Sequence, residues 1–137
     1  MRQGQFAKDA DSRDRLWRLA NDFYQEALQV NPNVVRVLQN QGSLRLLQGD
    51  DRSRTDPAAA RVMYDQARQL YRRTLEINPH DQFPHYRMAL ACAKLGDWDC
   101  SREYLESGPK EPGSVKPELW RRLREAIDAR DASRIAD

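Results

Sequence analysis

Two stretches of this sequence decide the fold, because one repeats the other. Residues 17–32 read W-R-L-A-N-D-F-Y-Q-E-A-L-Q-V-N-P, and residues 64–79 read Y-D-Q-A-R-Q-L-Y-R-R-T-L-E-I-N-P. At an offset of 47 residues the copies share an alanine, a tyrosine, a leucine and a closing Asn-Pro: Ala20 with Ala67, Tyr24 with Tyr71, Leu28 with Leu75, and Asn31-Pro32 with Asn78-Pro79. Agreement at so many positions in one register indicates an internal repeat.

Both copies have the spacing of an amphipathic helix. Their apolar and small residues recur every three or four positions and therefore share one helical face: Trp17, Ala20, Tyr24, Ala27 and Leu28, and in the second copy Tyr64, Ala67, Tyr71, Thr74 and Leu75. Each helix is expected to stop at its Asn-Pro, because proline lacks an amide donor and disfavours helical geometry in the preceding residue.

Further helices are predicted around the two copies. The stretch 33–48 carries an apolar stripe with Gly42 in its middle, and Gly49 is expected to cap its C-terminal end. Glycine costs about 1 kcal/mol in a helix interior, so Gly42 indicates the close approach of another helix. Two shorter helices are predicted over residues 84–95 and 97–107, joined by a tight turn.

Short motifs recur along these helices: Ala20-x3-Tyr24 with Pro32, Ala67-x3-Tyr71 with Pro79, His85-x2-Met88-Ala89-x2-Cys92, Gly96-Asp97-Trp98 with Ser101-x3-Leu105, and Leu38-x2-Gln41-Gly42-x2-Arg45 with Gly49-Asp50. Together they resemble the tetratricopeptide repeat family, whose unit of about 34 residues is a helix–turn–helix. The resemblance covers residues 12–107, about two and a half repeats. It implies an all-α superhelix of antiparallel helix pairs.

The chain departs from the family pattern in its segment lengths. The middle unit has 47 residues, so residues 51–63 are an insertion, expected to form a loop plus added turns on the following helix. That helix should begin at Pro57 with Asp56 as its N-cap. The remaining segments are a poorly matching N-terminal stretch, a Pro/Gly-rich linker, and a capping helix with its tail: residues 1–11, 108–117 and 118–137.

Composition excludes several classes of function. The chain has 23 basic and 21 acidic residues, a net charge of +2, so no electrostatic signature of a nucleic-acid binder is present. Its longest apolar run, residues 88–93, is far shorter than the roughly 20 residues that span a bilayer, and no signal-peptide pattern is visible. We therefore expect no transmembrane segment and no nucleic-acid partner; the sequence favours a soluble, cytoplasmic location but does not identify the compartment.

No cluster in the sequence indicates catalysis or a metal. His80 and Asp81 fall in a predicted turn, and His85 falls at a core position of a helix, so each has a structural explanation. Cys92 is interpreted as a buried residue with a free thiol, and a bridge to Cys100 across the tight turn is the minor alternative. Their spacing is not that of a zinc site. We expect no enzyme, no catalytic residue, no metal and no cofactor.

The resemblance also implies a binding site, since the first helix of each pair lines a concave groove that holds a partner's peptide in this family. Carried onto this chain, ten residues would line it: Arg36, Gln39, Asn40, Ser43, Leu47, Phe83, Tyr86, Arg87, Leu90 and Lys94. Asn40 and Arg87 match two of the five positions with which chaperone-binding members clamp a carboxylate. Phe83 replaces a lysine, and Gln5 and Asp9 fall in the poorly matching stretch, so this clamp is not expected.

The apolar groove residues have two interpretations. Phe83, Tyr86 and Leu90 would form an anchor typical of an interface centre, or some of them pack against the capping helix. We predict a non-enzymatic module that binds a peptide or partner protein in the groove. A basic face shared by four arginines is interspersed with acidic residues and is interpreted as solvated: Arg61, Arg68, Arg72 and Arg73.

The alternative function is a self-assembling scaffold, with a homo-oligomer formed through the first helix, or a segment of a longer protein whose first helix packs on another domain. Its basis is an aromatic and apolar stripe, Trp17, Tyr24 and Leu28, for which the sequence upstream offers no evident covering partner.

Overall fold

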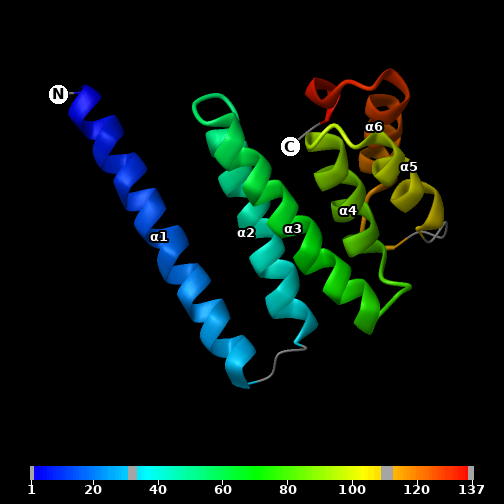
Figure 1. The fold of residues 1–137 in the computed structure, drawn as a ribbon, viewed down its shortest axis with the longest axis horizontal. Helices are drawn as coiled ribbons and strands as arrows, with labels where there is room; N and C mark the ends of the chain where they lie inside the picture. The colour runs from blue at the N-terminus through cyan, green and yellow to red at the C-terminus, as the bar shows by residue number, and fades with distance from the viewer. Residues whose placement is uncertain (1, 31–33, 109–112, 136–137) are drawn as a thin grey trace.

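A computed structural model describes residues 2–30, 34–108 and 113–135, and only the backbone of residues 2–10, 28 and 30. The described residues are all-α, without a strand, which confirms the predicted class. Six α-helices and a short 3-10 turn follow one another: α1 Arg2–Val30, α2 Val35–Arg52, α3 Pro57–Ile77, α4 Gln82–Lys94, α5 Trp98–Ser107, α6 Pro117–Ala129 and the turn Ala132–Arg134. Helices α1 to α5 lie side by side in chain order, and α6 packs across α4 and α5 (Figure 1).

Helices α2 and α3 form the most extensive pair, and two glycines of α2 allow it. A Cβ atom on Gly42 would lie 2.8 Å from Cζ of Tyr71, and one on Gly49 would lie 2.5 Å from Cε1 of Tyr64. The close contact expected at Gly42 is confirmed. The expectation that Gly49 caps the helix is wrong, because α2 continues to Arg52 and Gly49 makes room for a tyrosine ring instead.

The insertion lengthens both helices of this pair. Asp56 accepts a hydrogen bond at 3.1 Å from the amide of Ala59, and Pro57 opens α3, as predicted. Helix α3 then runs for 21 residues and ends at Ile77, before the Asn-Pro. For the first copy, Asn31 and Pro32 lie outside the described residues.

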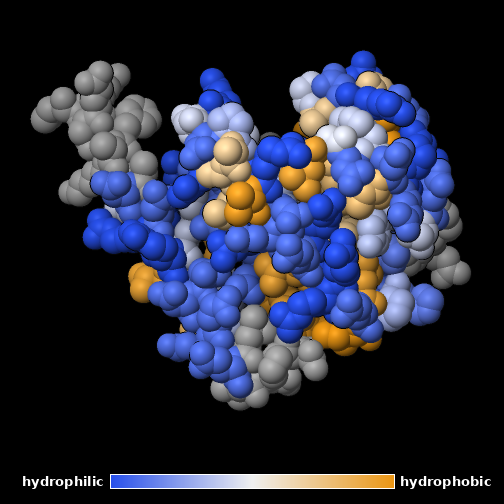
Figure 2. Space-filling view, in the orientation of Figure 1, coloured by the Kyte–Doolittle hydropathy of each residue, from blue (hydrophilic) through white to orange (hydrophobic). Residues whose placement is uncertain are grey.

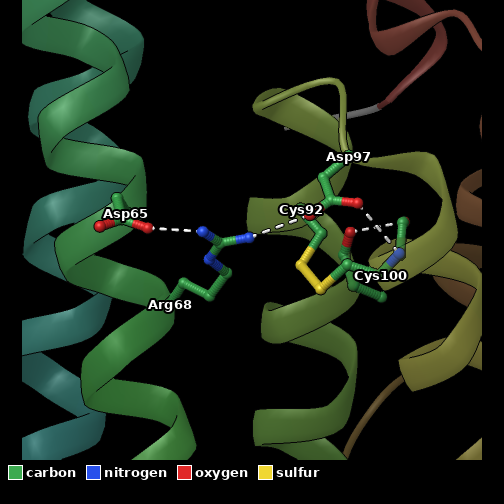
Figure 3. Close-up of a disulfide and its surroundings, with 7 residues drawn as sticks. Asp65, Arg68, Cys92, Asp97 and Cys100 are labelled. Carbon is green, nitrogen blue, oxygen red and sulfur yellow. Dashed lines mark hydrogen bonds and ion pairs between the residues drawn. A yellow bond between two sulfur atoms is a disulfide. The ribbon is translucent and has the colours of Figure 1, made fainter.

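Helices α4 and α5 form a short hairpin. Gly96 takes a φ of +75°, in the left-handed region that glycine tolerates, and Asp97 then caps α5 by accepting from the amide of Cys100 at 3.2 Å. A disulfide joins Cys92 to Cys100, whose Cα atoms lie 5.8 Å apart (Figure 3). The favoured interpretation of Cys92 as a free thiol is therefore wrong, because the tight turn brings both cysteines to the contact between the helices.

Helix α6 covers α4 and α5 with its apolar side. Leu123 and Ile127 are buried, and the ring of Trp120 meets the ring of Tyr86 edge-on at 5.4 Å. The segment before α6 is attached to the start of α4, since the amide of Val115 donates to the side chain of Gln82 at 2.9 Å. The predicted final helix is thus present and begins at Pro117, one residue before the expected start of that segment.

Helix α1 is long and only partly covered. It spans 29 residues, including the segment that matched the repeat poorly, and its N-terminal half diverges from α2 (Figure 1). Its contact with α2 is polar: Asn21 accepts hydrogen bonds at 3.1 Å from both Gln41 and Arg45. Trp17 and Tyr24 share this α2-facing side and are half-buried, so the prediction that they form an uncovered stripe is wrong. The side chain of Leu28 lies outside the described part.

Candidate interaction groove

A groove of about 270 Å³ lies between α2 and α4, with one residue of α6 at its edge. Its lining brings together six of the ten residues expected from the sequence: Ser43, Leu47, Tyr86, Arg87, Leu90 and Lys94. Three further lining residues were not predicted: Leu46, Asp50 and Leu119.

The other four expected residues lie beside the pocket. Arg36 and Asn40 are exposed on α2. With Ser43 and Leu47 they follow the three- and four-residue spacing of one helical face, which places them on an extension of the groove.

Gln39 and Phe83 are engaged within the fold. The side chain of Gln39 donates to Asp81 at 3.0 Å, and the ring of Phe83 lies edge-on to Tyr71 at 6.2 Å. Both residues therefore tie α2 and α3 to the start of α4, and they shape the groove without lining the pocket.

A tyrosine of α3 underlies the groove. Because Gly42 has no side chain, the ring of Tyr71 lies against α2, and its hydroxyl reaches Ser43 on the groove side at 2.7 Å. Burial raises the pKa of Tyr71 to about 12, although the Ser43 hydrogen bond and the positive charge of Arg87 act in the opposite direction. The phenol therefore stays neutral across the physiological range and fixes the position of Ser43.

Arg87 supplies a positive charge that has no carboxylate partner among the described residues. Its guanidinium lies 5.1 Å from the centroid of the Phe83 ring, which orients it by a cation–π contact. Its Nε is buried without a hydrogen-bond partner among the described residues, and none of their carboxylates forms an ion pair with it. A bound group with an oxygen acceptor would satisfy this arginine.

At the opposite end of the groove the charge is compensated. Lys94 forms an ion pair with Asp50 at 2.6 Å, and the hydroxyl of Tyr64 donates to the same carboxylate at 2.7 Å. Between this pair and Arg87 the wall is apolar, with Leu46 and Leu90 buried and Leu47 exposed. The site thus combines an apolar centre, a cation without an ion pair to any described residue at one end, and a neutral pair at the other.

Asp50 and Leu119 were missed for identifiable reasons. The predicted end of the second helix at Gly49 left Asp50 outside any helical face, whereas α2 carries it one turn beyond Leu46. Leu119 falls within the segment predicted as a capping helix, and nothing in the sequence says where that helix packs. For Asp50, the available signal in the sequence was its four-residue spacing from Leu46.

The other candidate clusters have structural roles. The Nε2 of buried His85 lies 2.8 Å from the carbonyl oxygen of Pro79, and its ring packs on Tyr104, while His80 is exposed in the turn. In the described part of the chain, no three His, Cys, Asp or Glu side chains gather as a metal site would require.

Two residues of the arginine face, Arg61 and Arg68, make polar contacts within the fold. Arg68 bridges Asp65 at 2.6 Å and Asp97 at 3.3 Å (Figure 3), and Arg61 donates to the carbonyl of Leu95 at 3.2 Å. An open hollow of about 500 Å³ lies along these residues, between α3 and the turn after α4. The charge of Arg68 is thus paired locally, whereas Arg61 meets a neutral carbonyl oxygen.

Comparison with protein-family models finds no match, and comparisons with curated proteins and with solved structures find none either. The likeness to the tetratricopeptide family therefore rests on the residues quoted above. Among the described helices, none combines the length and apolarity that crossing a membrane requires.

Proposed function

We propose that this chain is a non-enzymatic helical-repeat module of the tetratricopeptide type, which binds a peptide segment of a partner protein along the groove between α2 and α4. One observation carries the proposal: two helices that are not consecutive in the chain bring Ser43, Leu47, Arg87 and Leu90 to one pocket with an apolar centre and a cation that has no ion pair within the described part of the chain. The same residues are those at which the family resemblance expects a ligand.

The size of the groove favours part of a polypeptide over a small molecule. Its volume of about 270 Å³ lies at the lower limit of the roughly 300–1,000 Å³ typical of small-molecule sites. One large apolar side chain of a peptide would fill the centre against Leu46 and Leu90. Arg87 would then donate to a carbonyl or carboxylate oxygen of the same peptide. Arg36 and Asn40 offer further contacts to a longer segment.

Peptide selection on the immobilised chain tests the proposal. From a random peptide library we expect ligands with an apolar anchor, whose affinity falls at least tenfold in Leu47→Asp and in Arg87→Ala. Val62→Asp is the matched control, because Val62 is 52% exposed on α3 while Leu47 is 56% exposed on the groove wall. Ligands that tolerate Leu47→Asp and Arg87→Ala as well as they tolerate Val62→Asp would overturn the proposal, and so would a library that yields no ligand.

A further inference from the structure

The side of α1 turned away from α2 is unusually apolar for a surface. Leu16, Leu19 and Phe23 are 65%, 65% and 67% exposed, and they follow one another at intervals of three and four residues. They therefore form one continuous stripe, here called the outer stripe. Figure 2 shows hydrophobic atoms at this outer edge of α1. Large apolar side chains gathered in this way mark an interaction surface.

The outer stripe is uncovered because α1 has a described neighbour on one side only. Helix α2 lies between α1 and α3, α3 lies between α2 and α4, and α4 is covered by α3, α5 and α6. Helix α1 contacts α2 through Asn21 and through the ion pair of Arg13 with Asp51 at 3.2 Å. Its opposite side lacks the second helix that the inner helices of this fold have.

The charges beside the outer stripe match those of a second copy of the same helix. Arg15 precedes Leu16, and Asp22 precedes Phe23 seven residues later. Both side chains are exposed, and neither forms an ion pair with another described residue. In two antiparallel copies that cross near Leu19, the arginine of each faces the aspartate of the other.

We propose that two copies of this chain associate through antiparallel pairing of their α1 helices, related by a two-fold axis. The two Leu19 side chains meet at the axis, Leu16 of one copy packs against the partner's Phe23, and Arg15 of one copy pairs with the partner's Asp22; symmetry makes the last two contacts twice. Each α1 thereby covers the outer stripe of the other. The contact involves one helix per copy, below the size of a standard interface, so the dimer dissociates on dilution.

Sedimentation equilibrium on the full chain tests the association. We expect a reversible monomer–dimer equilibrium and a strict monomer at every concentration for Leu19→Asp, with unchanged helicity because this side chain lies outside the fold. Val62→Asp is again the control and should dimerise like the wild type. A wild-type chain that stays monomeric at about 0.5 mM, or a dimer that persists in Leu19→Asp, would overturn the proposal.

A charge-swap experiment tests the antiparallel geometry separately. Arg15→Asp alone and Asp22→Arg alone should each weaken self-association at least tenfold, because like charges then meet. A mixture of the two variants should form a heterodimer of wild-type strength, since both cross-pairs are then opposite in sign. A mixture that associates no better than the separate variants would contradict the antiparallel arrangement.

Discussion

Tyr71 links the core of the molecule to its groove, because its ring fills the space over Gly42 while its hydroxyl reaches Ser43. The residue is fully buried, and its pKa is raised from 10.0 to about 12. The sequence repeat placed this tyrosine on an apolar helical face. It did not indicate that the hydroxyl would reach Ser43, because that contact depends on the glycine of a different helix.

The raised pKa of Tyr71 predicts a loss of stability at alkaline pH. An unfolded tyrosine ionises near pH 10, whereas Tyr71 keeps its proton to about pH 12 in the folded chain. Its contribution is therefore fully present below pH 10 and is lost as the pH rises through 12, by about 3 kcal/mol. Urea unfolding between pH 9 and 12 should show this fall relative to Tyr71→Phe. If the free energy of unfolding fell equally with pH in the two proteins, the prediction would be contradicted.

Gly42→Ala tests the close contact under Tyr71. Alanine favours a helix over glycine by about 1 kcal/mol, but its Cβ would lie 2.8 Å from a ring that is buried and hydrogen-bonded. Overpacking of a core costs about 1–3 kcal/mol, so we expect a net loss of about 1–2 kcal/mol in the free energy of unfolding. Asn40→Ala, on the exposed side of the same helix, should be neutral or slightly stabilising. A stabilised Gly42→Ala protein would contradict the packing described here.

At the scale of elements, the disulfide makes the α4–α5 hairpin a closed unit. The bond spans a sequence separation of 8 residues, and closing so short a loop restricts the unfolded chain by about 2.5 kcal/mol. Reduction should lower the free energy of unfolding by this amount, measured by urea titration with and without a thiol reductant. A Cys92→Ala/Cys100→Ala chain should have the free energy of unfolding of the reduced protein, and the reductant should not change that value. Equal stability of the oxidised and reduced wild type would contradict the prediction.

Local signals in the sequence defined most helix boundaries. Asp56-Pro57, the Asn-Pro after Ile77, and Gly96-Asp97 mark ends that the structure keeps, because each end depends on capping chemistry within a few residues. The end of α2 could not be located in this way. Gly49 has the local signature of a cap, and only the packing of Tyr64 from the next helix shows that it lies inside one.

For helix α1, local sequence was equally unable to show which side of the helix would be covered. It has apolar residues on two sides, one with Trp17 and Tyr24 and another with Leu16, Leu19 and Phe23. The spacing identified the first side and expected it to be exposed, whereas α2 half-covers it and leaves the second bare. Which side of a doubly apolar helix is covered depends on the partner, and the helix alone does not contain that information.

At the scale of the whole molecule, α6 packs its apolar side against α4 and α5 and completes the hydrophobic core. Leu123→Ala should lower the free energy of unfolding by about 3 kcal/mol, because this buried leucine would leave a cavity against the core. Arg124→Ala, at the exposed neighbouring position, should change it by less than about 0.5 kcal/mol. Thermal unfolding of both variants measures the difference. An equal, small effect would show that α6 is not part of the cooperative fold.

The groove is also a property of the whole molecule. Six of its lining residues were among those expected from the family resemblance. Phe83 and Gln39 do not line the pocket, because they contact Tyr71 and Asp81, which come from other elements. The spacing along one helix predicts which of its side chains share a face. Which of these side chains line a common pocket depends on the packing of three helices, α2, α4 and α6.

The central claim, that the groove between α2 and α4 is the working surface, is tested most directly by amide chemical-shift mapping of the full chain with a selected peptide. The account predicts the largest shifts at Ser43, Leu47, Arg87 and Leu90, with little change along the arginine face of α3. Shifts concentrated on that face, or on the outer stripe of α1, would contradict it.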